Sequence, residues 1–262
     1  MPMKPQASRW LFAAAMIALG ITGLVNGDFA LAWQQVPADL PGRVVLVYAC
    51  ALIELATGVG LLPRRTLVPA CRILFPYLLL WLVLLEVPGV IHAPLNAGAW
   101  GSFGEIAIMT AGAWCLFATH AGPRGKPGVR HRAPRHPCRT LAARRCAAHD
   151  RRGSEVHFGN HVMQPWLQWL PWPAGWAGLT GIGSIAACLA LLFGVWPRLA
   201  ATVEAAMLGL ITVSYWGPDL QTGRTATTAF IISLLITAGV WLVADTYRAT
   251  PWLATRRPVW KS

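Results

Sequence analysis

Residues 67–91 read LVPACRILFPYLLLWLVLLEVPGVI, a run of 25 residues that contains only two charged side chains. A helix that crosses the hydrocarbon core of a bilayer needs about 17–25 mostly apolar residues, so this run predicts a transmembrane helix. The other apolar runs of comparable length are 10–25, 44–62, 103–119, 176–196, 199–215 and 225–244. Because they are unbroken rather than alternating, an outer-membrane barrel is excluded. We therefore predict an all-α, polytopic transmembrane helical bundle of about seven spans.

The composition agrees with a membrane protein. Of the 262 residues, 55% are hydrophobic and only 12% are charged, and this charged fraction is about half that of an ordinary soluble domain. The formal net charge of +12 is concentrated, because residues 121–155 hold ten of the 22 Lys and Arg residues. A nucleic-acid-binding protein places its basic residues over a folded surface, so no nucleic-acid partner is expected.

The first apolar run has two interpretations. Lys4 and Arg9 precede it and Ala30-Leu31-Ala32 follows it, which is the order of features in a cleavable signal peptide. We favour a retained span, because Asp28 lies in the would-be cleavage region and the internal repeat described next requires this helix.

Two short patterns recur in the same order and predict a tandem repeat. GLLPR at 60–64 returns as GVWPR at 194–198, and TAGAW at 110–114 returns as TAGVW at 237–241. Residues 1–120 then form a first unit of four helices. Residues 157–250 form a second, truncated unit of three helices, and a basic tail follows at 251–262.

These motifs, with WGSFGE at 100–105 opening the fourth helix and the stretch 176–205 in the second unit, resemble the DoxX-like family of small four-helix membrane proteins. The resemblance implies a multi-pass protein of the bacterial inner membrane. Named members of the family are linked to quinol or thiosulfate oxidation and to redox-stress complexes. The implied role is a non-catalytic or accessory component of a quinone-linked redox system, with quinone or a redox-complex subunit as partner.

Residues 121–156 take the place of the second unit's first helix, and no lipid-spanning segment accommodates so many basic side chains. Their Arg-, Pro-, His- and Ala-rich composition is what an out-of-frame translation of GC-rich coding sequence gives, and we favour this interpretation. The alternative is a basic, disordered cytoplasmic linker, whose charges would attract anionic lipid.

The positive-inside rule places the N-terminus, the Arg64-Arg65 loop and the basic block in the cytoplasm. Seven alternating spans then place Arg198 and the basic tail outside. An eighth crossing between residues 120 and 176 would return both to the inside.

Ionisable side chains within or beside the spans are the candidate site, because they are costly in lipid. The candidates are Glu54 near mid-membrane, Asp28, Glu86, His92 and Glu105 in the outer leaflet, and Glu204 in the second unit. The first five predict a polar pocket open to the periplasm with Glu54 beneath it, where carboxyls could exchange protons. The structural alternative is that Glu86 and Glu105 reach headgroup water while Glu54 hydrogen-bonds a neighbouring helix.

Two rival functions remain open. Repeated helical units with carboxylates near the midplane are typical of a small-solute or proton-coupled carrier, and a catalytic quinone oxidoreductase subunit is the third possibility. No metal site is expected, because Cys138 and Cys146 lack the usual zinc-ligand spacing. No resident cofactor is predicted beyond quinone as a candidate ligand. The bilayer is the expected environment, and a homo-oligomer is compatible with the sequence.

Overall fold

The computed structural model describes residues 7–30, 34, 36–37, 39–121, 173–218, 220 and 223–255, without the side chains of 97–98 and 173–178. The regular elements in this part of the chain are all helices. They are α1 (Ala7–Asn26), α2 (Arg43–Gly60), α3 (Leu67–Trp81), η1 (Leu82–Glu86), α4 (Val87–His92), α5 (Ala97–His120), α8 (Pro173–Phe193), α9 (Pro197–Ile211), η3 (Thr212–Trp216) and α10 (Arg224–Thr246).

Within the described residues, six helical stretches are long and apolar enough to cross a membrane. They are Ala7–Asn26, Arg43–Gly60, Leu67–His92, Ala99–His120, Pro197–Trp216 and Arg224–Thr246. The apolar part of α8, Leu179–Phe193, is shorter and completes a set of seven helical regions. The predicted polytopic helical bundle is confirmed, and the chain is an integral, multi-pass membrane protein.

The two units share an uncommon backbone feature. In the first, α3 runs for 15 residues and passes into the five-residue π-helical turn η1. In the second, α9 also runs for 15 residues and passes into the five-residue π-helical turn η3. Because π-turns are rare, their recurrence at the same position of equivalent helices adds a structural correspondence to the sequence repeat.

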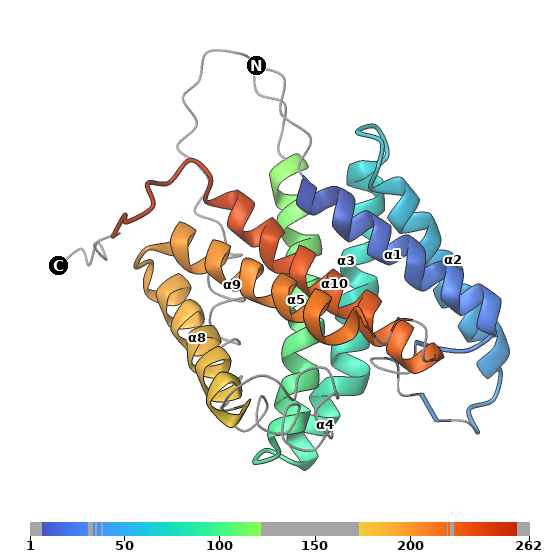
Figure 1. The fold of residues 1–262 in the computed structure, drawn as a ribbon. Coiled ribbons are helices and arrows are strands. Elements are labelled where there is room, and N and C mark those ends of the chain that lie inside the picture. Colours follow the sequence, from blue (N-terminus) through green and yellow to red (C-terminus); the bar gives the residue numbers. More distant parts are fainter. Residues whose placement is uncertain are drawn as a thin grey trace.

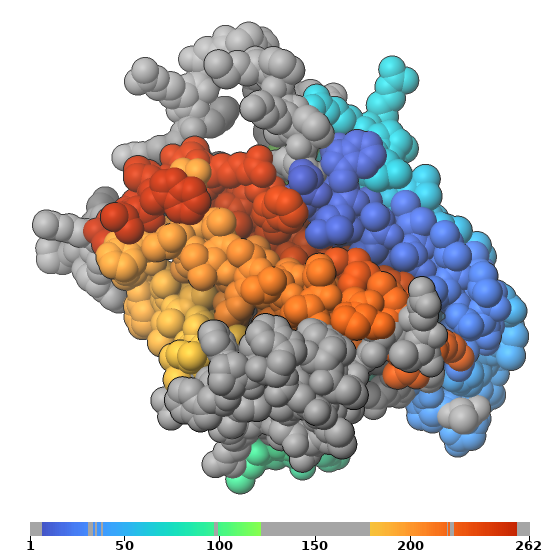
Figure 2. Space-filling view, viewed as in Figure 1, coloured from blue at the N-terminus to red at the C-terminus, as the bar shows by residue number. Residues whose placement is uncertain are grey.

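Helix α10 lies at the centre of the bundle, although it is the last helix in the described part of the chain. It packs against α1 and α5 of the first unit and against α9 of its own unit, while α8 flanks α9 (Figure 1). Its buried Ile232 and Leu235 belong to the same hydrophobic core as Phe12 of α1 and Met109 of α5. In the space-filling view the surface of the second unit adjoins that of α1 (Figure 2). The two units therefore share one core.

Helices α5 and α10 cross where both carry glycine. A Cβ atom built on Gly112 would lie 2.9 Å from the Cα atom of Gly239, which leaves no room for a side chain at Gly112, and one built on Gly239 would lie 3.2 Å from the Ile108 carbonyl oxygen, a tight contact. These glycines occupy the same position in TAGAW and TAGVW. Equivalent helices of the two units thus meet at equivalent residues, and small residues of this kind permit close packing in membranes.

Contacts at the helix ends fix the direction of the second unit relative to the first. Ser8, in the first turn of α1, donates to Asp245 near the end of α10. At the other end, Arg224 at the start of α10 pairs with Asp28, just after α1. Helices α1 and α10 are therefore antiparallel. Arg198 at the start of α9 donates to the Thr250 carbonyl, so it lies on the face where α1 begins.

This arrangement corrects the expectation from seven alternating spans, which put Arg198 on the face opposite the start of α1. The rings of Phe75 in α3 and Trp114 in α5 are 5.0 Å apart, and the two helices run in opposite directions (Figure 1). Helix α5 thus ends on the face where α1 begins, whereas α8 begins on the opposite face (Figure 1). The interpretations of residues 121–156 and of the tail beyond 255 lie outside the described residues.

Candidate functional site

The interior of the bundle holds a small hydrogen-bonded cluster around Glu54 of α2. Glu54 is only 2% exposed. The Tyr77 hydroxyl of α3 donates to Glu54 Oε1 over 2.7 Å, and Gln34 Nε2 donates to the same oxygen over 3.1 Å. Gln34 Nε2 also lies 3.0 Å from the Tyr77 hydroxyl oxygen. We call Glu54, Tyr77 and Gln34 the carboxyl cluster.

Gln34 reaches this cluster because the connection between α1 and α2 folds back into the bundle. Gln34 is 3% exposed and Phe29, earlier in the same connection, is 2% exposed. The amide N–H of Ala30 donates to Gln34 Oε1 over 3.2 Å, so both ends of the side-chain amide are bonded. The Nε2 group must therefore face Glu54, since an amide oxygen donates no hydrogen bond. Gln34 of this connection thus lies against the Glu54 carboxyl inside the bundle.

Aromatic rings line the cluster. The Tyr77 and Trp81 rings are 6.3 Å apart at 85°, and the Phe29 and Trp81 rings are 5.8 Å apart at 75°. Both are edge-to-face arrangements, which aromatic pairs prefer over stacked sandwiches. Cys50, one helical turn before Glu54, is 9% exposed and lies beside the Tyr77 hydroxyl.

The carboxyl cluster has hydrogen-bond donors but no positive charge among the described residues. A lone ionised carboxylate in the membrane interior is costly, so Glu54 holds its proton or depends on the two donors. The cluster thus offers one carboxyl that can exchange a proton, one phenolic hydroxyl and one amide. This set can recognise a molecule that carries carbonyl or hydroxyl oxygens.

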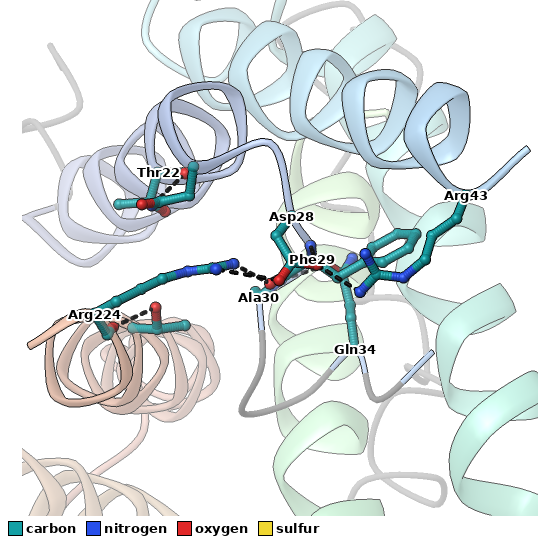
Figure 3. Close-up of polar contacts among 9 residues, drawn as sticks. Thr22, Asp28, Phe29, Ala30, Gln34, Arg43 and Arg224 are labelled. Carbon is teal, nitrogen blue, oxygen red and sulfur yellow. Dashed lines mark hydrogen bonds and ion pairs between the residues drawn. The ribbon is translucent and has the colours of Figure 1, made fainter. Parts of the chain in front are cut away.

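A second polar group, the Asp28 cluster, lies at the end of α1 (Figure 3). Arg43 Nη2 is 2.5 Å from Asp28 Oδ1, and Arg224 Nη1 is 3.1 Å from Asp28 Oδ2. Arg224 Nη2 also donates to the Phe29 carbonyl over 3.1 Å, and the Phe29 N–H donates to Asp28 Oδ1 over 2.8 Å. These contacts fasten the α1–α2 connection to the first residues of α2 and α10.

The Asp28 carboxylate is ionised in this setting. Burial works to raise its pKa, but hydrogen bonds from Arg43, the Phe29 N–H and Arg224 outweigh burial and hold the pKa below its ordinary value. The Arg43 guanidinium also lies 5.3 Å from the centre of the Phe29 ring. Asp28 is therefore a permanent anion that positions the connection carrying Gln34.

The remaining candidate residues are Glu86, His92, Glu105 and Glu204. Glu86 at the end of η1 and Glu105 in α5 are half-buried and lie within electrostatic range of each other. His92 is exposed at the end of α4. Among the described residues, no hydrogen bond or ion pair joins these three to Asp28 or Glu54. Glu204 of α9 accepts a hydrogen bond of 2.8 Å from Ser184 of α8. The hydrogen bonds thus join Glu54, Asp28 and Glu204 to different partners, and a common pocket for the candidate residues stays a prediction.

Four side chains of these clusters were not identified from the sequence: Gln34, Arg43, Tyr77 and Arg224. Tyr77 carried a detectable signal, because it is a hydroxyl-bearing residue inside an apolar run. Arg43 stands at the start of a predicted span, where a basic residue is ordinary. Gln34 and Arg224 lie in or beside connections without periodicity, so no local pattern singled them out.

Among the described residues, no group of three or more His, Cys, Asp and Glu side chains is arranged to hold a metal ion. No protein-family model, no curated protein and no solved structure matches the chain. The carboxyl cluster and the Asp28 cluster are therefore the basis for assigning a function.

Proposed function

We propose that this protein is an accessory, non-catalytic component of a quinone-linked membrane redox system, and that the carboxyl cluster is its quinone site. One observation carries the proposal: the buried Glu54 carboxyl, bonded by the Tyr77 hydroxyl and the Gln34 amide inside the helix bundle. Ionisable side chains in membrane interiors are costly and mark ligand or proton pathways.

The chemistry of the cluster suits a quinone head group. A quinone oxygen accepts hydrogen bonds, and the corresponding quinol hydroxyl donates one. Tyr77 and Gln34 supply donors, and Glu54 supplies an acceptor that can exchange a proton. The rings of Phe29 and Trp81 supply the apolar, aromatic surroundings that a flat head group requires. Since both donors already serve Glu54, a quinone oxygen would take the place of Glu54 Oε1 as the acceptor of the Gln34 N–H.

The family resemblance supports the same proposal. The motifs at 60–64 and 100–105 resemble the DoxX-like family, whose named members are linked to quinol or thiosulfate oxidation and redox-stress complexes. The motif at 60–64 follows α2, which carries Glu54, and precedes α3, which carries Tyr77. The resemblance therefore covers the helices that form the cluster.

A titration with a short-chain ubiquinone analogue tests the proposal. When the analogue binds to the purified protein in quinone-free detergent, the tryptophan fluorescence of the protein should decrease, because Trp81 adjoins the cluster. Glu54→Gln and Tyr77→Phe should each weaken binding about tenfold or more, as expected when a charge-assisted hydrogen bond is lost. Glu204→Gln is the matched control and should bind like the wild type. Equal affinity of the wild type and Glu54→Gln would reject the site.

A carrier is the second candidate function, because each unit holds a carboxyl that is hydrogen-bonded to a hydroxyl of a neighbouring helix. Glu54 pairs with Tyr77 in the first unit, and Glu204 pairs with Ser184 in the second. Paired carboxylates in repeated units are a transporter arrangement. Solute counterflow in proteoliposomes that is lost in both Glu54→Gln and Glu204→Gln would favour the carrier over the accessory role.

We further propose that the protein lies in the bacterial inner membrane with its N-terminus in the cytoplasm. The face where α1 begins carries Arg9, Arg64, Arg65, Arg198 and Arg248. On the opposite face, Arg43 and Arg224 are both paired with Asp28. The positive-inside rule therefore assigns the α1-start face to the cytoplasm.

Cysteine labelling should show this orientation for both units. In a variant without the native cysteines, Leu95→Cys should react with a membrane-impermeant maleimide in intact cells, because Leu95 is 89% exposed on the face where α1 ends. Leu253→Cys should react only after the membrane is opened, since the adjacent Ala254 carbonyl contacts the start of α9. Labelling of Leu253→Cys in intact cells would contradict the arrangement of the second unit.

A further inference from the structure

One peptide group of the α1–α2 connection is hydrogen-bonded at both of its ends (Figure 3). Its carbonyl oxygen, which belongs to Phe29, accepts from Arg224 Nη2 over 3.1 Å. Its N–H, which belongs to Ala30, donates to Gln34 Oε1 over 3.2 Å. A trans peptide is planar, and its C=O and N–H point in opposite directions. Arg224 and Gln34 are therefore joined through a single rigid group.

The same series of hydrogen bonds continues into the carboxyl cluster. Gln34 Nε2 donates to Glu54 Oε1 over 3.1 Å and lies 3.0 Å from the Tyr77 hydroxyl oxygen. The Ala30 N–H determines which end of the Gln34 amide faces Glu54, because it bonds the amide oxygen. A reversed amide would present its oxygen to Glu54 and its NH₂ group to the Ala30 N–H, where no hydrogen bond can form. The orientation of the peptide therefore sets the orientation of the Gln34 donor.

Arg224 fixes the orientation of this peptide from the second unit. It is the first residue of α10, and it holds the connection through two nitrogens: Nη2 bonds the Phe29 carbonyl and Nη1 bonds Asp28 Oδ2, each over 3.1 Å. Because a guanidinium is planar, two bonds fix its orientation as well as its position. Charged donors also form stronger hydrogen bonds than neutral ones, and hydrogen bonds in series polarise one another.

We propose that Arg224 is a positioning residue for ligand binding at the carboxyl cluster, and that it acts through the peptide between Phe29 and Ala30 and through the Gln34 amide. The inference rests on the proposed quinone site, where a quinone oxygen takes the place of Glu54 Oε1 as the acceptor of the Gln34 N–H. With Arg224 in place, this N–H is already oriented when the ligand arrives, so binding requires less ordering. The first unit supplies the site, and the second unit orients one of its donors.

A double-mutant cycle tests this route, with the affinity for the short-chain ubiquinone analogue measured by tryptophan fluorescence. Arg224→Met should weaken binding about three- to tenfold in the wild-type background, as expected for coupled members of one hydrogen-bonded network. In the Gln34→Ala background, which lacks the last link, Arg224→Met should cause no further loss. Arg248→Met is the matched control and should bind like the wild type, because Arg248 pairs with Asp245 at the other end of α10.

The outcomes separate this inference from the quinone site itself. If Arg224→Met binds like the wild type while Glu54→Gln binds weakly, the quinone site holds and the role of Arg224 is overturned. Equal losses in the two backgrounds would also overturn it, since Arg224 would then act by a route other than Gln34. If Arg224→Met does not fold, Arg224→Lys replaces it. Lysine keeps the charge beside Asp28 but lacks the planar fork, so it should weaken binding only when Gln34 is present.

A second measurement requires no ligand and decides the case in which the wild type binds no quinone. Glutamine side chains are labelled with a heavy nitrogen isotope for NMR, and the Gln34 amide resonance is assigned by its loss in Gln34→Ala. Arg224→Met should shift this resonance, whereas Arg248→Met should not. A Gln34 resonance that Arg224→Met leaves unchanged would overturn the inference. A shifted resonance in a protein without quinone binding would support the coupling of Arg224 to Gln34 and reject the quinone function alone.

Discussion

Gly20→Val is expected to destabilise the bundle more than any other single change considered, by about 3 kcal/mol or more. A Cβ atom on Gly20 of α1 would lie 2.6 Å from the backbone N of Leu55 and 2.7 Å from the backbone O of Ala51, both in α2. The contact is reciprocal, since a Cβ atom on Gly58 would lie 2.8 Å from the backbone N of Ile17. A side chain at Gly20 must therefore separate two backbones.

The loss is measured as the Tm and the free energy of unfolding in detergent, followed by circular dichroism. Gly101→Val is the matched control, because nothing lies within 4 Å of the Cβ position of Gly101 in α5. The free energy of unfolding of this control should fall by no more than about 1 kcal/mol, because glycine and valine differ little in helix propensity. Equal losses at Gly20 and Gly101 would show that α1 and α2 do not pack backbone to backbone.

Glu54→Leu is expected to have the second largest effect on stability. It removes the acceptor that the Tyr77 hydroxyl and the Gln34 amide share inside the bundle. Two buried donors that lose their acceptor would cost about 2–6 kcal/mol together, at about 1–3 kcal/mol each. Because Gln34 Nε2 keeps the Tyr77 hydroxyl oxygen as an acceptor, we expect the lower part of this range, about 2–4 kcal/mol. Glu54→Gln retains an acceptor oxygen and should lose less than about 1 kcal/mol.

Unfolding in detergent, by the same method, measures both variants. Glu204→Leu provides a comparison, because among the described residues the half-buried Glu204 has one hydrogen-bonded partner, Ser184. Its loss should therefore be smaller than that of Glu54→Leu. A Glu54→Leu protein as stable as the wild type would mean that the hydrogen bonds of the carboxyl cluster contribute nothing to the fold.

The transmembrane helices could be predicted from the sequence because a span is a local property of length and hydropathy. The predicted run 67–91 corresponds to the helical stretch Leu67–His92 in the structure, and the predicted run 225–244 corresponds to Arg224–Thr246. The π-turns η1 and η3 could not be predicted, because nothing in their composition separates them from the helices that they continue. The direction of the second unit also required tertiary contacts, such as the one between Arg224 and Asp28.

The candidate site was accessible from the sequence only in part. Glu54 was identified because a carboxyl within an apolar run is a local anomaly. Its partners Gln34 and Tyr77 lie 20 and 23 residues away. Gln34 meets it because the α1–α2 connection folds back into the bundle, and Tyr77 meets it because α3 packs against α2. Asp28 was likewise identified, but its partner Arg224 lies 196 residues later in the chain. Such pairs depend on how the two units pack.

The quinone content of the purified protein tests the central claim most directly, because it requires no added ligand. Wild-type protein, Glu54→Gln and Glu204→Gln are purified from the same bacterial membranes in parallel, extracted with organic solvent, and analysed by chromatography. The proposed site predicts near-stoichiometric quinone in the wild type and in Glu204→Gln, and strongly reduced quinone in a folded Glu54→Gln protein. Absence of quinone from the wild type, or equal quinone in the wild type and Glu54→Gln, would contradict the proposal that the carboxyl cluster binds quinone.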